Sequence, residues 1–221
     1  MGINIKEQDR ILVVAPHPDD ESIGCGGLLS IYGKQCDVLV ITDGDSKNGE
    51  TDIADIRESE FERAISLTGV RNHFFLRIPE RKINLFKDRI SEIKFSEYNH
   101  IFVPNRYDEH KDHVAVYKII KRLVNKKSKL YEYEVWTPLR IPNIYVDISE
   151  VSENKINMIK AHESQVAELD YVGMIMGLNV YRGRSHGYEF AECYYCAKEM
   201  REQKIRRFKR KLRKVIEYKV K

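Results

Sequence analysis

Short apolar runs alternate with amphipathic stretches along the first 124 residues of the chain. The runs are rich in β-branched residues and leucine, and they predict buried parallel strands at residues 11–15, 36–42, 73–78 and 101–104. The stretches after them have apolar positions at helical spacing and predict helices over residues 22–33, 51–68, 83–95 and 113–124. This alternation predicts an α/β fold, a Rossmann-like doubly wound and mostly parallel sheet with helices on both faces.

The second half of the chain has a different pattern. Alternating or aromatic-rich runs predict three further strands, at residues 131–136, 144–148 and 188–196. Residues 155–165 are expected to form a helix, and Arg182, Arg184 and His186 are expected to share a loop before Gly187. We find no internal repeat and no long linker, so we expect one domain over residues 1–197 and a separate tail over residues 198–221.

Side chains that can bind metals or transfer protons follow the first predicted strand at once. Residues 16–21 read Pro-His-Pro-Asp-Asp-Glu. Aspartate and proline are also common at ordinary helix starts, but folding alone requires no imidazole and three carboxylates in one turn. Open α/β sheets bind their ligands at the carboxyl ends of the strands. We therefore expect this turn to be the functional centre.

A second cluster, His-Lys-Asp-His at residues 110–113, follows the fourth predicted strand by a few residues. In a doubly wound sheet it opens on the same edge as the first turn. His17, Asp20 and His113 could then supply the three nitrogen and oxygen ligands of a catalytic zinc, and the same donors accept other divalent ions. Asp19 and His110 would remain as the acid–base groups that hydrolysis requires.

Taken together, the two motifs resemble those of a known enzyme family. Residues 15–21, Ala-Pro-His-Pro-Asp-Asp-Glu, and residues 110–113 are similar to the motifs of the PIG-L/LmbE-like zinc-dependent N-acetylglucosaminyl deacetylases. Weaker similarity, such as Thr-Asp-Gly at residues 42–44, extends over most of residues 10–196. Those enzymes remove the N-acetyl group of N-acetylglucosamine-containing conjugates. Lys111 departs from the proline common at its position, which affects only the local shape of the loop.

The resemblance implies a role for each residue of the two motifs. His17, Asp20 and His113 match the zinc ligands of the family. Asp19 matches the general base that deprotonates the attacking water. His110 matches the histidine that stabilises the tetrahedral oxyanion and can protonate the leaving amine.

Four more residues are candidates for supporting or substrate-binding roles. Asp112 would orient the catalytic imidazole at position 110, as carboxylates commonly do. Arg57 matches a family position near the substrate. Arg184 and His186, together with Arg182, lie in the expected loop before Gly187 and are candidates for lining the substrate site and contacting a substrate phosphate.

Two short motifs invite other interpretations. The glycine-rich residues 24–27 follow a strand, but their spacing differs from G-x-G-x-x-G and the acidic turn before them would repel a pyrophosphate. We expect close backbone packing there instead. Cys193 and Cys196 have C-x-x-C spacing without a second pair, and their alternation fits a strand. Because we find no secretory signal at the start of the chain, we expect reduced core thiols and a cytoplasmic protein.

The tail is strongly basic. Residues 198–221 hold 12 Lys and Arg against 3 Asp and Glu, a net charge of +9, so the chain's +4 leaves the remaining residues at −5. Ile205, Phe208, Leu212 and Val215 recur at helical spacing, which suits peripheral contact with an anionic membrane such as the inner membrane surface. Packing on the domain, an oligomer contact or a solvated charge run are the alternatives. The acidic body argues against nucleic-acid binding.

The sequence therefore predicts a zinc-dependent hydrolase that releases acetate and a free amine from an N-acetylglucosamine-containing conjugate. The substrate could be a glycolipid, a nucleotide sugar or a small glycoside. One alternative is a zinc hydrolase of another amide or ester. Another is a sugar- or lipid-binding protein without turnover, against which the filled catalytic positions argue.

Overall fold

A five-stranded parallel sheet forms the centre of the computed structural model, which describes residues 2–45, 52–205 and 208–209. The strand order is β3-β2-β1-β4-β5. These strands are β1 (Ile11–Ala15), β2 (Cys36–Thr42), β3 (Asn72–Ile78), β4 (His100–Pro104) and β5 (Lys129–Tyr133). This order confirms the predicted doubly wound sheet, whose strand order reverses between β1 and β4.

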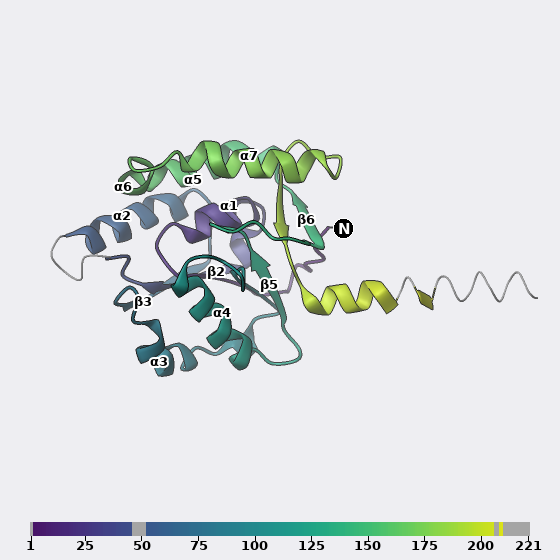
Figure 1. The fold of residues 1–221 in the computed structure, drawn as a ribbon, viewed down its shortest axis with the longest axis horizontal. Helices are drawn as coiled ribbons and strands as arrows, with labels where there is room; N and C mark the ends of the chain where they lie inside the picture. Colours follow the sequence, from purple (N-terminus) through teal and green to yellow (C-terminus); the bar gives the residue numbers. More distant parts are fainter. Residues whose placement is uncertain (1, 46–51, 206–207, 210–221) are drawn as a thin grey trace, which may run out of the picture.

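Helices cover both faces of the sheet, as predicted (Figure 1). One face carries α1 (Asp20–Tyr32), α2 (Ile53–Ser66), α5 (Ser152–Ala161), α6 (Glu163–Val166) and α7 (Tyr171–Arg184). The other face carries α3 (Lys87–Ser91) and α4 (Lys111–Leu123). Each face has its own buried apolar cluster, one including Val13 and Phe61 and the other including Val14 and Val116. Alternate residues of β1 thus point into opposite clusters, as expected for a strand that is buried on both sides.

A second, two-stranded antiparallel sheet pairs β6 (Ile144–Asp147) with β7 (Ala191–Tyr194). A single antiparallel bridge between Glu132 and Tyr195 connects the end of β7 to β5, the edge strand of the main sheet. Short 3-10 turns lie at residues 33–35, 83–86, 95–97 and 149–151.

The prediction of one continuous helix over residues 83–95 is wrong. The structure has a 3-10 turn (Ile83–Phe86), the short α3, and a second 3-10 turn (Phe95–Glu97). Ile83, Ile90 and Phe95 are all buried. In a continuous helix Phe95 would lie about 140° around the axis from Ile90, so the helix must end for both side chains to reach the core.

The loop expected before Gly187 is also wrong, because α7 occupies most of that segment. Its buried positions include Asn179 and Gly183, whereas Val180 and Tyr181 are exposed. The polarity pattern therefore does not mark the buried face, and three glycines lower the helix propensity further. The helix expected over residues 155–165 is interrupted at His162, which separates α5 from α6. β5 ends at Tyr133, earlier than the expected residue 136.

The glycines of α1 provide close packing, as expected. A Cβ atom at Gly24 would lie 2.2 Å from Cδ2 of Tyr133, and one at Gly27 would lie 2.4 Å from Cγ2 of Ile148. Both neighbours belong to the packed core rather than to an open phosphate-binding loop. The tight turn and helix start thus bring α1 directly against the sheet.

A buried ion pair also holds α1 in place. Lys155 of α5 and Glu192 of β7 are both fully buried, with Nζ and Oε1 2.6 Å apart. Lys155 donates to the carbonyl of Ile23, and the Glu192 carboxylate accepts the N–H groups of Gly27 and Leu28 at 2.8 Å. The pair therefore links two elements, α5 and β7, to the backbone of α1.

The tail begins on the opposite edge of the sheet from the carboxyl ends of the strands. Residues 197–205 are helical, and Lys198 donates to the carbonyls of Lys126 and Lys127, just before β5 begins. Ile205 and Phe208 are exposed. Leu212 and Val215 lie outside the described residues, and contact with a membrane stays a prediction. Among the described residues, no helix is long and apolar enough to cross a membrane.

Asp37 anchors the amino-terminal edge of the sheet. Its buried carboxylate accepts hydrogen bonds from Tyr98 at 2.8 Å, from Asn72 at 3.0 Å and from Nε of Arg71 at 2.9 Å, and Arg10 pairs with it at 3.2 Å. Burial alone would raise the pKa of Asp37, but these donors outweigh it and hold the pKa below its ordinary value of 3.8.

We expect Asp37→Asn to lower the free energy of unfolding by about 2 kcal/mol at pH 7, because charge-assisted hydrogen bonds are lost. Since the folded state lowers this pKa, the contribution is present above the ordinary value of 3.8 and is lost as the pH falls through the folded value. Urea unfolding at pH 7 and at progressively lower pH should show the difference between wild type and variant shrinking. A constant difference would contradict the assignment.

Candidate functional site

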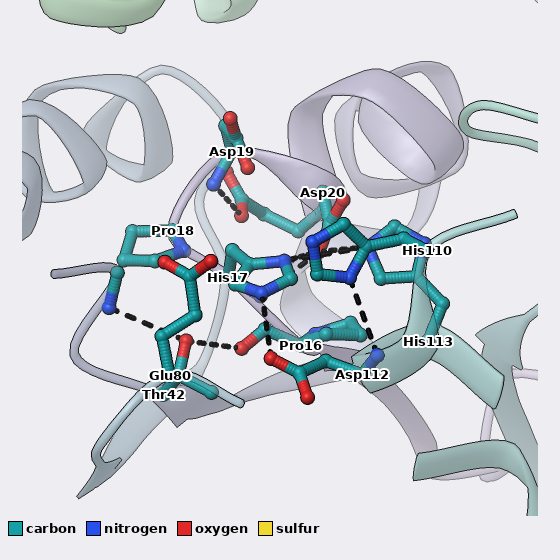
Figure 2. Close-up of polar contacts among 12 residues, drawn as sticks. Pro16, His17, Pro18, Asp19, Asp20, Thr42, Glu80, His110, Asp112 and His113 are labelled. Carbon is teal, nitrogen blue, oxygen red and sulfur yellow. Dashed lines mark hydrogen bonds and ion pairs between the residues drawn. The ribbon is translucent and has the colours of Figure 1, made fainter. Parts of the chain in front are cut away.

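Two turns meet at the carboxyl edge of the sheet where the strand order reverses (Figure 2). The turn from β1 into α1 carries His17 and Asp19, and Asp20 begins α1; the loop from β4 into α4 carries His110, and His113 lies in the first turn of α4. The three imidazoles lie side by side, with ring centroids 4.6–5.3 Å apart. The reversal leaves the crevice into which both turns project.

Three donor atoms converge as a metal site requires. Nδ1 of His17 lies 3.1 Å from Oδ2 of Asp20, Nε2 of His113 lies 3.2 Å from the same oxygen, and the two nitrogens are 3.3 Å apart. Ligands of a tetrahedral zinc, with bonds of about 2.0–2.1 Å, are separated by about 3.3 Å. The donor set of two imidazoles and one carboxylate therefore fits zinc in chemistry and in spacing.

Carboxylates also face the outer nitrogens of both imidazoles. Oδ2 of Asp112 lies 3.4 Å from Nε2 of His17. Oδ1 of Asp108 lies 3.2 Å from Nδ1 of His113, and this second contact is close enough for an ion pair but is not aligned as a hydrogen bond. Such carboxylate–histidine pairs typically orient metal ligands. We expected the Asp112 carboxylate to orient His110; the structure directs it to His17 instead, and only its backbone N–H contacts His110.

This concentration of carboxylates favours positive charge on the two histidines. Burial alone would lower the pKa of His17, but Asp112 and Asp20 outweigh it and raise the pKa to about 9. Burial would likewise lower the pKa of His113, but Asp20 and Asp108 outweigh it and raise that pKa to about 10. The site is thus built to stabilise a cation.

Other donor groupings exist within the same cavity. Ligand atoms of His17, His110 and His113 lie within 4.8 Å of one another, as do those of His17, Glu80 and Asp112. The donor atoms of His17, Asp20 and His113 lie closer together, at 3.1–3.3 Å from one another. We therefore favour His17, Asp20 and His113 as the ligands.

Asp19 occupies the N-cap position of α1 but does not cap the helix with its side chain. Its φ and ψ are 152° and −27°, in a region where non-glycine residues typically carry about 1–3 kcal/mol of strain. Oδ2 of Asp19 pairs with Nη2 of Arg57 at 3.1 Å, and Arg57 also donates to the carbonyls of Gly44 and Pro18. Burial raises the pKa of Asp19 to about 6 against the influence of Arg57, within the range useful for proton transfer near neutral pH.

His110 is set up as a neutral hydrogen-bond donor. Its Nδ1 accepts the N–H of Asp112 at 3.2 Å, which assigns the proton of the neutral ring to Nε2. Burial, followed by the neighbouring His17 and His113, lowers the pKa of His110 to about 4. The surroundings of His110 thus lower its pKa, whereas those of His17 and His113 raise theirs.

A cavity of about 160 Å³ lies in front of these groups. Residues expected in the site that line it are His17, Asp19, Asp20, Arg57 and His110. Sequence analysis missed six others, Ile23, Glu80, Val135, Trp136, Gln165 and Tyr171, as contributors to the cavity. Glu80 follows β3 by two residues, so its position at a strand's carboxyl end was the available signal. Tyr171 had none, because it lies on the unexpected helix α7.

Arg184 and His186 are not brought to this cavity. They lie at the end of α7 opposite Tyr171, about 20 Å along a 14-residue helix. Arg184 is exposed and lies 3.7 Å from Glu189, and the ring of His186 stacks on Tyr145. Arg182, which we expected in the same loop, is half-buried on α7, where it pairs with Glu134 and donates to the carbonyl of Leu139. We therefore leave these residues out of the site.

Comparison with known proteins places the two turns in context. The sequence model of the PIG-L family, described as GlcNAc-PI de-N-acetylase, matches residues 12–124. The diacetylchitobiose deacetylase of Thermococcus kodakarensis is 26% identical over 217 residues, with 83% of this chain and 81% of that protein covered. A probable N-acetyl-α-D-glucosaminyl L-malate deacetylase of Bacillus cereus is 27% identical, with 71% and 83% covered.

A solved structure has the same fold. The N,N'-diacetylchitobiose deacetylase from Pyrococcus horikoshii superposes with a TM-score of 0.70 at 22% identity, covering 85% of this chain and 83% of that one. At this identity the likeness supports the fold rather than the chemistry.

We expect the wild-type chain to bind one zinc ion, and Asp20→Asn and His113→Gln to weaken zinc binding more than about 100-fold, because each removes a ligand. Asp112→Asn should weaken it by about 10–100-fold through loss of the carboxylate at His17. Zinc titration of metal-free protein, with metal content measured after dialysis, provides the test.

Glu80→Gln and His110→Asn are the matched controls and should retain zinc. If Glu80→Gln lost zinc as completely as Asp20→Asn, the ion would lie between His17, Glu80 and Asp112 instead.

Proposed function

The chain belongs to the PIG-L family, whose sequence model matches more than half of it, and we propose that it is a zinc-dependent hydrolase that removes an N-acetyl group from an amino-sugar conjugate. The observation that carries this proposal is the orientation of Asp19. Its buried carboxylate faces the cavity beside the three convergent donors instead of capping α1. A helix start needed only for folding would use that carboxylate on its own N–H groups.

His17, Asp20 and His113 would hold the metal. When bound, a divalent cation supplies Lewis-acid polarisation of the amide carbonyl and lowers the pKa of a water molecule. Asp112 and Asp108 keep the two imidazoles in the required orientation through their outer nitrogens. The ligands are thus fixed before any substrate enters.

Asp19 and His110 would carry out the proton transfer and the charge stabilisation. The Asp19 carboxylate accepts a proton from the attacking water and returns it to the nitrogen of the leaving amine, so acetate and a free amine result. Nε2–H of His110 donates to the carbonyl oxygen, on which negative charge grows. Arg57 keeps the Asp19 carboxylate in place by its ion pair.

The substrate class rests on the relatives. The Thermococcus and Bacillus proteins are named as deacetylases of a chitobiose and of a glucosaminyl malate, both N-acetylated amino-sugar conjugates. We propose that this chain takes a substrate of that class. The cavity's polar lining, which includes Glu80, Arg57 and Gln165, suits the hydroxyl groups of a sugar.

We expect Asp19→Asn to lower kcat for acetate release by about 10²–10⁴-fold, because the amide cannot accept the proton, while zinc binding is retained. The measurement is acetate release by zinc-loaded protein from lipid-linked, nucleotide-linked and simple N-acetylglucosamine conjugates. Lys111→Pro, in the second motif but away from the donors, is the matched control and should remain active.

Activity of Asp19→Asn at the wild-type level would remove Asp19 from the role of base. No acetate from any conjugate, with zinc bound, would instead favour hydrolysis of another amide or ester, or binding without turnover.

A further inference from the structure

Asp19 lines the cavity while its backbone has an unfavourable conformation. An aspartate at an N-cap ordinarily has extended backbone geometry and accepts N–H groups of the first helical turn. Asp19 has a φ of 152° and makes no such bond, although its carbonyl accepts the N–H groups of Ser22 and Ile23 at 3.0 Å. Some other group must therefore oppose relaxation of this residue.

The Glu21 side chain is the group that binds the Asp19 backbone. Glu21 is fully buried, and its Oε2 accepts the N–H of Asp19 at 3.1 Å. Its other oxygen, Oε1, accepts the hydroxyl of Ser22 at 2.7 Å and lies 3.2 Å from Nε2 of His162. Both carboxylate oxygens of Glu21 thus have partners. Oε2 binds the backbone of the turn, and Oε1 contacts Ser22 and His162, which hold the Glu21 side chain in place.

His162 brings this anchor from a distant part of the chain. It is 1% exposed and lies at the junction of α5 and α6, where its carbonyl accepts the N–H groups of Gln165 and Val166. The junction is itself fixed, since Glu60 of α2 accepts the N–H and the hydroxyl of Ser164, both at 2.7 Å. Nε2 of His162 also lies 3.1 Å from the Ser22 hydroxyl. The imidazole is therefore an immobile partner for Glu21.

We propose that Glu21, held by Ser22 and His162, is a positioning residue that keeps the Asp19 backbone in this turn and its carboxylate in the cavity. The inference rests on the proposed function, because it takes Asp19 as the base. Among the described residues, the Glu21 carboxylate contacts the Asp19 N–H, Ser22 and His162, and it contacts none of the three metal donors. Its removal should therefore affect the base before it affects the metal.

The decisive comparison is Glu21→Ala with Glu21→Gln in zinc-loaded protein. Alanine removes the acceptor, so Asp19 can relax, and we expect kcat to fall about 100-fold, as for a displaced reacting group, with KM little changed. Glutamine retains a carbonyl oxygen for the Asp19 N–H, and its amide can donate to Ser22, so it should restore kcat to within about tenfold of wild type. Zinc content should equal that of wild type in both.

His162→Phe and Asp37→Asn complete the set. The first removes the distant anchor and should lower kcat less than Glu21→Ala does, because Ser22 still holds Glu21. The second removes a buried, hydrogen-bonded carboxylate at the opposite edge of the sheet and should leave kcat unchanged. If Glu21→Ala does not fold, the kcat values of wild type, Glu21→Gln and His162→Phe provide the test, and wild type should have the highest kcat.

A crystal structure of Glu21→Ala tests the geometry without any substrate. We expect Asp19 to leave its positive φ and its carboxylate to turn towards the N–H groups of α1. Wild-type kcat in the folded alanine variant, or loss of zinc in parallel with activity, would overturn the proposal. If wild type released no acetate, the proposed function would fail, while the Asp19 conformation in the alanine and glutamine variants would still decide the positioning role.

Discussion

Negative charge buried at the carboxyl edge of the sheet is the constraint on which the rest of the site depends. Asp20, Asp108 and Asp112 lie within a few ångströms of two imidazoles, in a region with little access to water. Buried carboxylates are costly unless they are paired with positive charge. The carboxylates therefore raise the pKa values of His17 and His113, which favours positive charge on both rings. A divalent cation held by the same donor atoms would supply that positive charge instead. Binding of a cation there would therefore stabilise the two turns.

The same small volume holds groups with opposite proton affinities. The pKa of Asp19 is raised to about 6 by burial, and that of His110 is lowered to about 4 by burial and by the positive charge on its neighbours. Environments that push neighbouring titratable groups in opposite directions are typical of sites where one group accepts a proton and another donates a hydrogen bond. In the proposed mechanism, the different roles of Asp19 and His110 would thus follow from their positions rather than from their residue types.

The body of the domain supports this edge through α1. Its first residue, Asp20, is one of the three convergent donors, its glycines pack against Tyr133 and Ile148, and the Lys155–Glu192 pair binds its backbone. The turn before α1 is held separately, by contacts from α2 and from the junction of α5 and α6. The described start of the basic tail, residues 198–205, by contrast, begins beside the amino end of β5, at the opposite edge of the sheet from the cavity.

The sequence by itself determined the doubly wound sheet and the meeting of the two motifs. Continuous β-branched runs and the rule that parallel strands end at one edge suffice to bring residues 17–20 and 110–113 together. It did not determine α7, whose buried face includes Asn179 and Gly183, or the carboxylate partner of each imidazole. Those depend on side-chain direction: the carboxylate of Asp112 faces His17, and Asp108 reaches His113. The conformation of Asp19 also required the tertiary structure, because a positive φ and its contact with Glu21 leave no trace in hydrophobic periodicity. Local pattern fixes which residues can meet, whereas packing between distant segments decides which atoms do.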